Sequence, residues 1–363
     1  MPIGYLVTLC IVGVFTGLAL IRFRRFGHVL FVLALPASEL PHLGMVFLGL
    51  STLLAWAQGD LTGATGSVLL IIAGLIFAGL AVLLLRALRA RGVIHQTLRA
   101  HGVKPLRRRA WWLRPLVFPF PWRPRSLTRT GPIFYGDDPR QRLDVYRLRK
   151  AEQPGPVFIY FHGGGYFSGG NRREARTLLY HLAARGWTCI SATYRLRPHA
   201  GFEEHLADAR AALQWAHDNA DVHGGNPETL VMAGSSAGGH LTALCALTRQ
   251  EPGRPQVDAA ICLYGYYGRY YGRDEHESPI STPLALDPSC APPFYIVHGD
   301  HDSYVPVAAA RALHDHLAQG ADQDVWYAEL PGAQHAFDVY ASWRFIAVIE
   351  GIDAFLKQHL SHA

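Results

Sequence analysis

A serine lies between small residues in the segment Gly234-Ser235-Ser236-Ala237-Gly238, which follows a β-type run and precedes an apolar helical stretch. G-x-S-x-G spacing between a strand and a helix is typical of a nucleophile elbow, a sharp turn that exposes the serine hydroxyl. The N-terminus of the helix then points its partial positive charge at the site where negative charge develops. We therefore predict Ser236 as a nucleophile, with Gly234 and Gly238 as the small residues that the turn requires. Ser235 is one position outside the motif.

A second segment, His162-Gly163-Gly164-Gly165, also follows an apolar β-type run. Consecutive glycines let backbone N–H groups approach a reacting carbonyl without obstruction, as an oxyanion hole requires. We expect the donors to be the amides of Gly164 and Gly165, together with that of Ala237. His162 is expected to shape this loop through a hydrogen bond rather than to act as a catalytic base.

An acid and then a histidine follow the serine along the chain, which is the order found with a nucleophile elbow. We predict that His335 takes the Ser236 proton and returns it to the leaving group. Asp302 would fix the imidazole tautomer and stabilise its charged form. Asp300, two residues earlier, is the competing acid.

These segments must be positioned by the elements around them. From about residue 142, short apolar β-type runs alternate with helical patterns. The predicted strands are 143–146, 157–161, 188–192, 229–232, 259–263, 294–297 and 325–328, and the predicted helices are 173–184, 203–219, 239–248, 307–317 and 343–359. This alternation predicts an α/β fold, a mostly parallel sheet with helices on both faces. Ligands then bind at the carboxyl ends of the strands, where all the segments above fall.

The N-terminal region, residues 1–88, is apolar enough to cross a membrane. The runs 3–21 and 66–88 are each long enough to span the hydrocarbon as a helix. Between them, residues 28–57 are interpreted as one crossing whose helix is broken at Pro36 and Pro41. No positive residue precedes the first run, so we expect a retained anchor rather than a cleaved signal peptide.

Arginines indicate the orientation of these helices. Basic clusters follow the first and the last run, whereas the loop 58–65 has neither Lys nor Arg. The positive-inside rule then predicts three crossings of the cell membrane, with the N-terminus outside and the C-terminal domain in the cytoplasm. If residues 28–57 cross twice, there are four crossings and the C-terminal domain faces outward.

A basic, aromatic linker, residues 89–129, joins this region to the C-terminal domain. Its part 104–129 contains five prolines and interleaves tryptophan and phenylalanine with Lys and Arg. We expect this part to lie on an anionic lipid surface; in the alternative, its aromatic residues pack onto the catalytic domain. Nucleic-acid binding is a poor fit, because residues 151–363 carry 14 Lys/Arg against 23 Asp/Glu.

With these motifs in place, the chain resembles an α/β-hydrolase of the hormone-sensitive-lipase and carboxylesterase group. Within that group it looks especially like the membrane-anchored mycobacterial esterases. The motifs that carry the resemblance are 162–165, 234–238, 299–302 and 334–337, and it covers the catalytic domain, residues 130–363. The resemblance implies hydrolysis of carboxylic esters through a serine ester, by Ser236, His335 and Asp302. Neither a metal ion nor a cofactor is implied.

The sequence departs from this group at two positions. Ser235 stands where such proteins commonly have an acid, and Tyr166 stands where they often have tryptophan. Fewer than thirty residues separate Leu263 from Pro292, so we expect no large cap domain. A short tyrosine- and glycine-rich segment, residues 264–272, is expected to cover the site in part.

The leading hypothesis is a membrane-anchored serine esterase or lipase whose substrate is an ester that partitions into lipid. The same triad could serve a serine peptidase or amidase, or an acyltransferase that excludes water. A non-enzymatic membrane scaffold with a hydrolase fold is the remaining alternative.

Overall fold

The computed structural model describes residues 3–22, 27–105, 109–249, 253–274 and 276–360. Its C-terminal part is built on one eight-stranded sheet with the order β1-β2-β4-β3-β5-β6-β7-β8. The pairings of β2 with β1 and with β4 are antiparallel, and the other five pairings are parallel. The strands are β1 (Leu127–Phe134), β2 (Arg142–Leu148), β3 (Gly155–Phe161), β4 (Thr188–Ala192), β5 (Gly225–Ser235), β6 (Ala259–Leu263), β7 (Phe294–Gly299) and β8 (Val325–Leu330).

Strand side chains alternate between two cores, one on each face of the sheet. Phe158 and Tyr160 of β3 pack in one core, and Val157, Ile159 and Phe161 pack in the other. The helices that cover the two faces are α6 (Arg176–Ala183) and α10 (Trp343–His359) on the first, and α7 (Phe202–Asp218), α8 (Ala237–Leu247) and α9 (Ala308–Gly320) on the second. The predicted α/β fold is therefore confirmed.

Strand β1 is the one strand of this sheet that the sequence did not predict. It lies at the edge, and only its first residue, Leu127, is fully buried. An edge strand with mostly exposed side chains lacks the apolar run by which buried strands are found. The sheet therefore begins slightly before residue 130, where the domain was expected to start.

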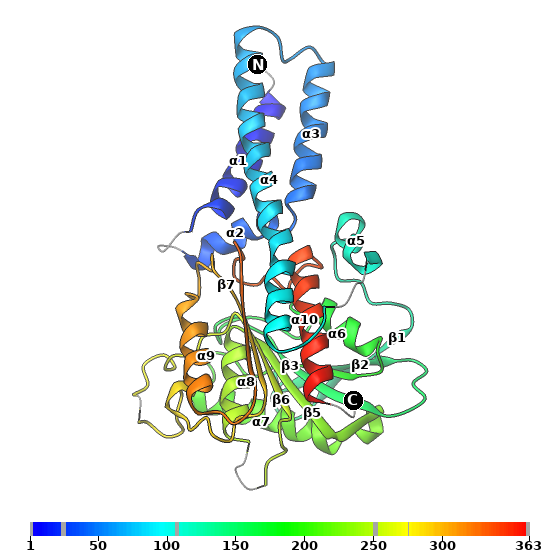
Figure 1. Ribbon diagram of the computed structural model, residues 1–363, viewed down its shortest axis with the longest axis vertical. Helices are drawn as coiled ribbons and strands as arrows, with labels where there is room; N and C mark the ends of the chain where they lie inside the picture. The colour runs from blue at the N-terminus through cyan, green and yellow to red at the C-terminus, as the bar shows by residue number, and fades with distance from the viewer. Residues whose placement is uncertain (1–2, 23–26, 106–108, 250–252, 275, 361–363) are drawn as a thin grey trace.

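Three helices stand upright on the sheet domain in Figure 1, namely α1 (Ile3–Leu20), α3 (Pro41–Ala57) and α4 (Gly63–Ala100). Glycines let them approach closely: a Cβ at Gly44 would lie 3.2 Å from the Leu80 side chain, and one at Gly79 would lie 2.8 Å from Thr16. Close approach through small residues is typical of helices that pack within a membrane. By length and apolar composition, α1 and α4 could each cross a membrane.

Helix α4 continues well beyond the expected end of the membrane segment at residue 88. Ala90, Ile94 and Leu98, spaced four residues apart, form an apolar stripe that is buried in the core shared with α6 and α10. Arg91 on the same helix pairs with Glu350 at 3.2 Å. Residues 89–100 thus pack on the sheet domain as a helix, whereas the sequence analysis had assigned them to a surface linker.

Helix α2 (Gly27–Glu39) does not continue the axis of α3, because the two helices are bent by 76° at Leu40. In Figure 1, α2 lies crosswise at the foot of the upright helices, next to the sheet domain. Its last residue, Glu39, is fully buried and forms an ion pair with Arg344 of α10. Residues 28–57 therefore do not form the expected single crossing. Helix α3 stands upright, whereas α2 packs on the sheet domain.

One part of the aromatic linker contacts the sheet domain, and another part is exposed. On helix α5 (Arg109–Val117), the Trp112 carbonyl accepts a hydrogen bond from Trp343 Nε1 at 2.9 Å. After α5, the side chains of Phe118, Phe120 and Trp122 are exposed and lie against one another. One part of the linker thus packs on the domain, and the other presents apolar surface near the foot of the bundle.

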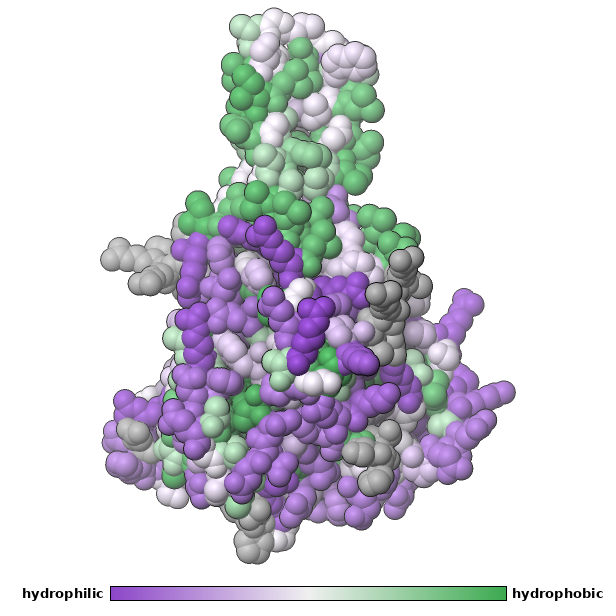
Figure 2. Space-filling model, viewed as in Figure 1, coloured by the Kyte–Doolittle hydropathy of each residue, from purple (hydrophilic) through white to green (hydrophobic). Residues whose placement is uncertain are grey.

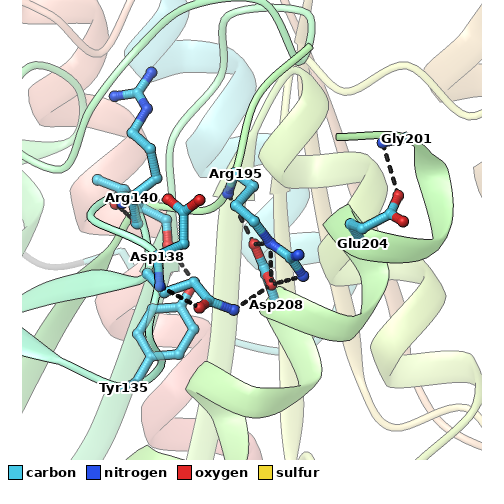
Figure 3. Close-up of polar contacts among 9 residues, drawn as sticks. Tyr135, Asp138, Arg140, Arg195, Gly201, Glu204 and Asp208 are labelled. Atoms are coloured by element: carbon cyan, nitrogen blue, oxygen red, sulfur yellow. Dashed lines mark hydrogen bonds and ion pairs between the residues drawn. The ribbon is translucent and has the colours of Figure 1, made fainter. Parts of the chain in front are cut away.

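A polar network fixes the loop between β4 and α7, as Figure 3 shows. Asp208 of α7 accepts hydrogen bonds from the Arg195 amide at 2.8 Å and from its guanidinium at 2.6 Å. Glu204 accepts from the Gly201 amide at the start of the helix. Two residues beyond Arg195, Arg197 stacks over the Phe167 ring at 4.6 Å, so this network supports the rim of the site described next.

Candidate active site

Ser236 lies at a sharp turn between β5 and α8. Its φ of +52° is a backbone conformation that L residues rarely adopt, as expected for a nucleophile elbow. A Cβ at Gly234 would lie 2.3 Å from the Gly238 carbonyl carbon, and one at Gly238 would lie 2.0 Å from the Phe161 carbonyl oxygen. Only glycine fits at both positions, so these two residues allow the turn to form.

Three side chains from separate loops meet at the elbow. His335 Nε2 lies 3.0 Å from Ser236 Oγ, and its Nδ1 lies 2.7 Å from Asp302 Oδ2. All three side chains are buried. Asp300 is directed elsewhere, since its carboxylate accepts a hydrogen bond from the Gly332 amide at 2.6 Å. The geometry is that of a Ser-His-Asp triad.

The surroundings of Asp302 keep its carboxylate charged. Its second oxygen accepts hydrogen bonds from the amides of Tyr304 and Val305, at 2.9 and 2.8 Å. His298, which is not among the predicted site residues, has its Nε2 3.2 Å from Asp302 Oδ2. Burial by itself would raise the pKa of Asp302, but His335 and the hydrogen bonds from both histidines lower it well below its usual range. Asp302 is therefore ionised when it holds His335.

The glycine loop after β3 packs against the nucleophile. A Cβ at Gly163 would lie 2.9 Å from the Ser236 Cβ. Gly164 and Gly165 have φ values of +110° and +59°, which favour glycine. Ala237 begins α8, so its amide belongs to the helical turn whose N–H groups have no intrahelical acceptor. The three predicted oxyanion donors thus come from two backbone segments next to Ser236.

His162 and Tyr166 flank this loop and hold its shape. His162 is fully buried, its Nδ1 donates to the Gly163 carbonyl at 2.6 Å, and burial lowers its pKa. The Tyr166 hydroxyl donates to His240 Nδ1 at 2.7 Å, while His240 Nε2 donates to the Ser281 carbonyl. Burial lowers the pKa of His240 to about 4, so the ring is neutral and can accept this bond.

A chain of buried oxygen atoms lies beneath the elbow, and the sequence analysis missed it. Glu174 accepts a hydrogen bond from the Gly163 amide at 2.5 Å and another from Ser235 Oγ at 3.1 Å. Ser235 Oγ is also in close hydrogen-bond contact with Tyr160, whose hydroxyl lies 3.1 Å from Asp338. Glu174 thus brings a carboxylate directly beneath the residue that precedes the nucleophile.

Counting hydrogens explains the protonation of Asp338. Glu174, Ser235, Tyr160 and Asp338 are joined by three oxygen–oxygen contacts, but the two hydroxyl groups supply only two hydrogens. A proton on Asp338 provides the third if Asp338 donates to Tyr160 and Tyr160 donates to Ser235. Burial, reinforced by the Glu174 carboxylate, raises the pKa of Asp338 to about 7. At pH 7 about half of the molecules therefore carry this proton.

A cavity of about 260 Å³ opens beside the nucleophile, on the side of the glycine loop. Tyrosines make up much of its wall: Tyr166, Tyr266, Tyr270, Tyr271 and Tyr304. Three of these belong to the segment 264–272, which was expected to cover the site in part. The cavity is smaller than the pockets that hold drug-sized ligands.

An aromatic side chain from the N-terminal region also reaches the site. The Phe31 ring of α2 lies edge-on to the His335 ring at 5.3 Å and stacks on Tyr304 at 5.5 Å. Phe31 belongs to a long apolar run, and nothing in its local sequence distinguishes it from its neighbours. Only the folded arrangement identifies it as part of the site.

The chain is similar in sequence and in fold to known esterases. A family model described as BD-FAE matches residues 143–264. The esterase LipC of Mycobacterium tuberculosis is 34% identical over 264 residues, which are 64% of this chain and 66% of LipC. The probable carboxylic ester hydrolase LipM of the same organism is 35% identical over 268 residues, 64% of this chain and 62% of LipM. The matches thus span slightly less than two thirds of these relatives.

Among solved structures, the apo form of Thermogutta terrifontis esterase 2 superposes with a TM-score of 0.55 at 24% identity. The superposition covers 64% of this chain and 95% of that one. At this level of identity the likeness supports the fold. The sequence matches confirm the expected relation to the mycobacterial esterases.

Proposed function

Because this chain is an α/β-hydrolase related to the mycobacterial esterases, we propose that it hydrolyses carboxylic esters through an acyl-enzyme on Ser236. The contact of His335 with both Ser236 and Asp302 is the observation that carries the proposal. A serine hydroxyl is a weak nucleophile unless a positioned base removes its proton. In this site the base is in place and its orientation is fixed.

In the first half-reaction, Ser236 Oγ attacks the ester carbonyl carbon and His335 Nε2 accepts the hydroxyl proton. Asp302 keeps the proton-bearing Nδ1 directed away from the serine and stabilises the imidazolium that forms. His335 then donates its proton to the alcohol oxygen as the bond between carbon and that oxygen breaks. The alcohol leaves, and the acyl group remains bonded to Ser236.

Negative charge collects on the carbonyl oxygen during this attack. Backbone N–H groups that already point at its position stabilise it without reorganisation. We assign this role to the amides of Gly164, Gly165 and Ala237. Loss of one such donor costs about 10²–10³-fold in kcat in other enzymes, so the geometry of the glycine loop governs the rate.

The second half-reaction repeats the proton transfers with water. A water molecule gives its proton to His335 and attacks the acyl carbon. His335 returns the proton to Ser236 Oγ as the bond from that oxygen to the acyl carbon breaks. The products are a carboxylic acid and the free enzyme, and one water molecule is consumed for each ester.

We further propose that the protein is integral to the cell membrane, with α1, α3 and α4 as three crossings. The apolar length of α1 and α4 and the glycine contacts between the helices support this assignment. Arg22, Arg86 and Arg89 lie at the end of the bundle nearer the sheet domain, and the positive-inside rule then supports our proposal that this domain is cytoplasmic. The substrate is then an ester that partitions into lipid.

Turnover of p-nitrophenyl butyrate and of the matching anilide by the full chain in detergent micelles tests the proposal. We expect a burst of p-nitrophenol equal to the enzyme concentration if deacylation is slower than acylation. Ser236→Ala should lower ester turnover by at least about 10³-fold. Ser289→Ala, which changes a partly exposed serine outside the triad, is the matched control. Faster turnover of the anilide, or unchanged ester turnover in Ser236→Ala, would contradict the proposal.

A further inference from the structure

The two sides of Ser236 differ in what surrounds them. The tyrosine-lined cavity is bounded by Gly165 and Ala237, which lie on the oxyanion side of the nucleophile. His335, which must give a proton to the leaving alcohol, does not line this cavity, and Tyr304 lies between the two. The acyl half of an ester therefore has the cavity available to it, and the alcohol half must lie near His335 Nε2.

The side that faces His335 is walled by helix α2. Phe31 is edge-on to the imidazole ring at 5.3 Å, and Leu35, one turn later, is buried in the core of the sheet domain. The helix is fixed at both ends. A Cβ at Gly27 would lie 1.8 Å from the Ser303 carbonyl oxygen, and Glu39 is paired with Arg344. Phe31 is thus held in place beside the catalytic base.

The opposite face of α2 is apolar and exposed. Val29 is 51% exposed and Val32 is 47% exposed. Figure 2 shows the hydrophobic surface of the upright helices continuing onto their foot, where Figure 1 places α2. An apolar band of this kind at the end of membrane-spanning helices is expected to be in contact with lipid.

We propose that α2 forms the alcohol subsite, and that the enzyme prefers esters of a short acyl group with a long apolar alcohol. The inference rests on the esterase function proposed above and adds its substrate class. The cavity, about 260 Å³ in volume, restricts the size of the acyl group, whereas the lipid sets no such limit on the alcohol chain. The alcohol chain passes Phe31 and remains among the lipid chains, so the ester can be cleaved without leaving the membrane.

Two isomeric esters distinguish a preference for a long alcohol from a general preference for hydrophobic substrates. Decyl acetate and ethyl decanoate have the same composition, but the long chain is in the alcohol of the first and in the acyl group of the second. Cleavage of decyl acetate consumes one water and releases decanol and acetic acid. We would measure both in phosphatidylcholine vesicles that contain the full-length protein. We expect kcat/KM for decyl acetate to be at least about tenfold higher.

Phe31→Ala tests the role of the helix. The ratio of kcat/KM for decyl acetate over ethyl acetate should fall about tenfold, because the long alcohol loses its contact beside His335. Phe31→Leu, which keeps an apolar side chain, should restore most of that ratio. Val29→Ala truncates an apolar side chain on the exposed face and is the matched control.

Each outcome separates the inference from the function on which it rests. Equal turnover of the two isomers, or preference for ethyl decanoate, would overturn the assignment of the subsites while leaving the esterase intact. An unchanged ratio in Phe31→Ala would overturn the role of α2. If the wild-type protein cleaved none of the three esters, nor p-nitrophenyl butyrate, the proposed function itself would fail, and the inference with it.

Discussion

Asp300 and Asp302 lie two residues apart in one loop and have different partners. Asp302 contacts His335 at 2.7 Å, whereas Asp300 accepts a hydrogen bond from the Gly332 amide. The backbone amides that point at Asp302 hold it in the orientation that the imidazole requires. At the residue scale, the identity of the acid is therefore decided by loop geometry rather than by residue type.

Replacing each aspartate by asparagine separates the two roles. Asp302→Asn removes the charge that stabilises the imidazolium and allows the wrong tautomer, so kcat should fall by about 10⁴-fold with little change in KM. Asp300→Asn keeps an acceptor for the Gly332 amide and should lower kcat far less. Steady-state kinetics on a soluble ester measure both. Equal losses in the two variants would show that Asp302 has no special part in the reaction.

The buried proton on Asp338 links stability to pH. Its folded-state pKa of about 7 lies above that of an unfolded aspartate, about 3.9. The protonated form therefore favours the folded state, and this contribution is lost as the pH rises through about 7. Buried histidines such as His162 and His240, whose pKa values are lowered, act in the opposite direction as the pH falls, so two proteins are compared at each pH. The thermal midpoint of the wild type in detergent, relative to that of Asp338→Asn, should be higher at pH 5.5 than at pH 8.5. An equal midpoint difference at both pH values would argue against a proton on Asp338.

The position of helix α2 could not be predicted from the sequence. Its apolar run was interpreted as half of a membrane crossing, because hydropathy does not show whether an apolar helix meets lipid or protein. The ion pair of Glu39 with Arg344 joins residues 305 positions apart and is seen only in the folded chain. This contact keeps α2 on the sheet domain.

Breaking this ion pair should destabilise the protein strongly. Arg344→Met leaves the Glu39 carboxylate buried without its cation, which costs about 3–5 kcal/mol in comparable sites. The double variant with Glu39→Leu removes both charges and should recover most of the loss, because two apolar side chains can replace a buried pair. Thermal unfolding of the solubilised protein measures the series. A double variant as unstable as Arg344→Met would show that the charge itself is not the cause.

Much of the fold and the triad could be predicted because their signals are local. The elbow at Ser236, the glycine loop and the apolar strands each lie within a few consecutive residues. The missed features are less local: Glu174 reaches Gly163 from 11 residues further along the connection between β3 and α6, and Phe31 reaches His335 from the N-terminal region. Single side chains in unremarkable sequence give no pattern to detect, and their roles follow only from packing.

At the scale of the whole molecule, α4 joins the apolar bundle to the catalytic domain as one helix. Its first part packs with α1 and α3, and its last part is buried in the core of the sheet domain. The active site lies next to the foot of the bundle, since Phe31 of α2 contacts the catalytic histidine. In our proposal, the side of the membrane on which the sheet domain lies is therefore also the side on which esters are cleaved.

Labelling of the exposed Cys290 shows directly on which side of the membrane the domain lies. It lies in the catalytic domain, whereas Cys10, the other exposed cysteine, lies on α1 within the hydrocarbon in our assignment. A membrane-impermeant maleimide should label Cys290 in inside-out vesicles and not in intact cells. Cys290→Ser should abolish this labelling. Labelling of Cys290 in intact cells would place the domain outside and would require an even number of crossings if the N-terminus is outside.

Fluorophosphonate labelling of isolated membranes tests the central claim, the nucleophilic role of Ser236, most directly. The probe bonds covalently only to a serine activated by its neighbours. We predict labelling of the wild type and of Ser235→Ala, and loss of labelling in Ser236→Ala. Labelling that persists in Ser236→Ala, or that disappears only in Ser235→Ala, would contradict the account.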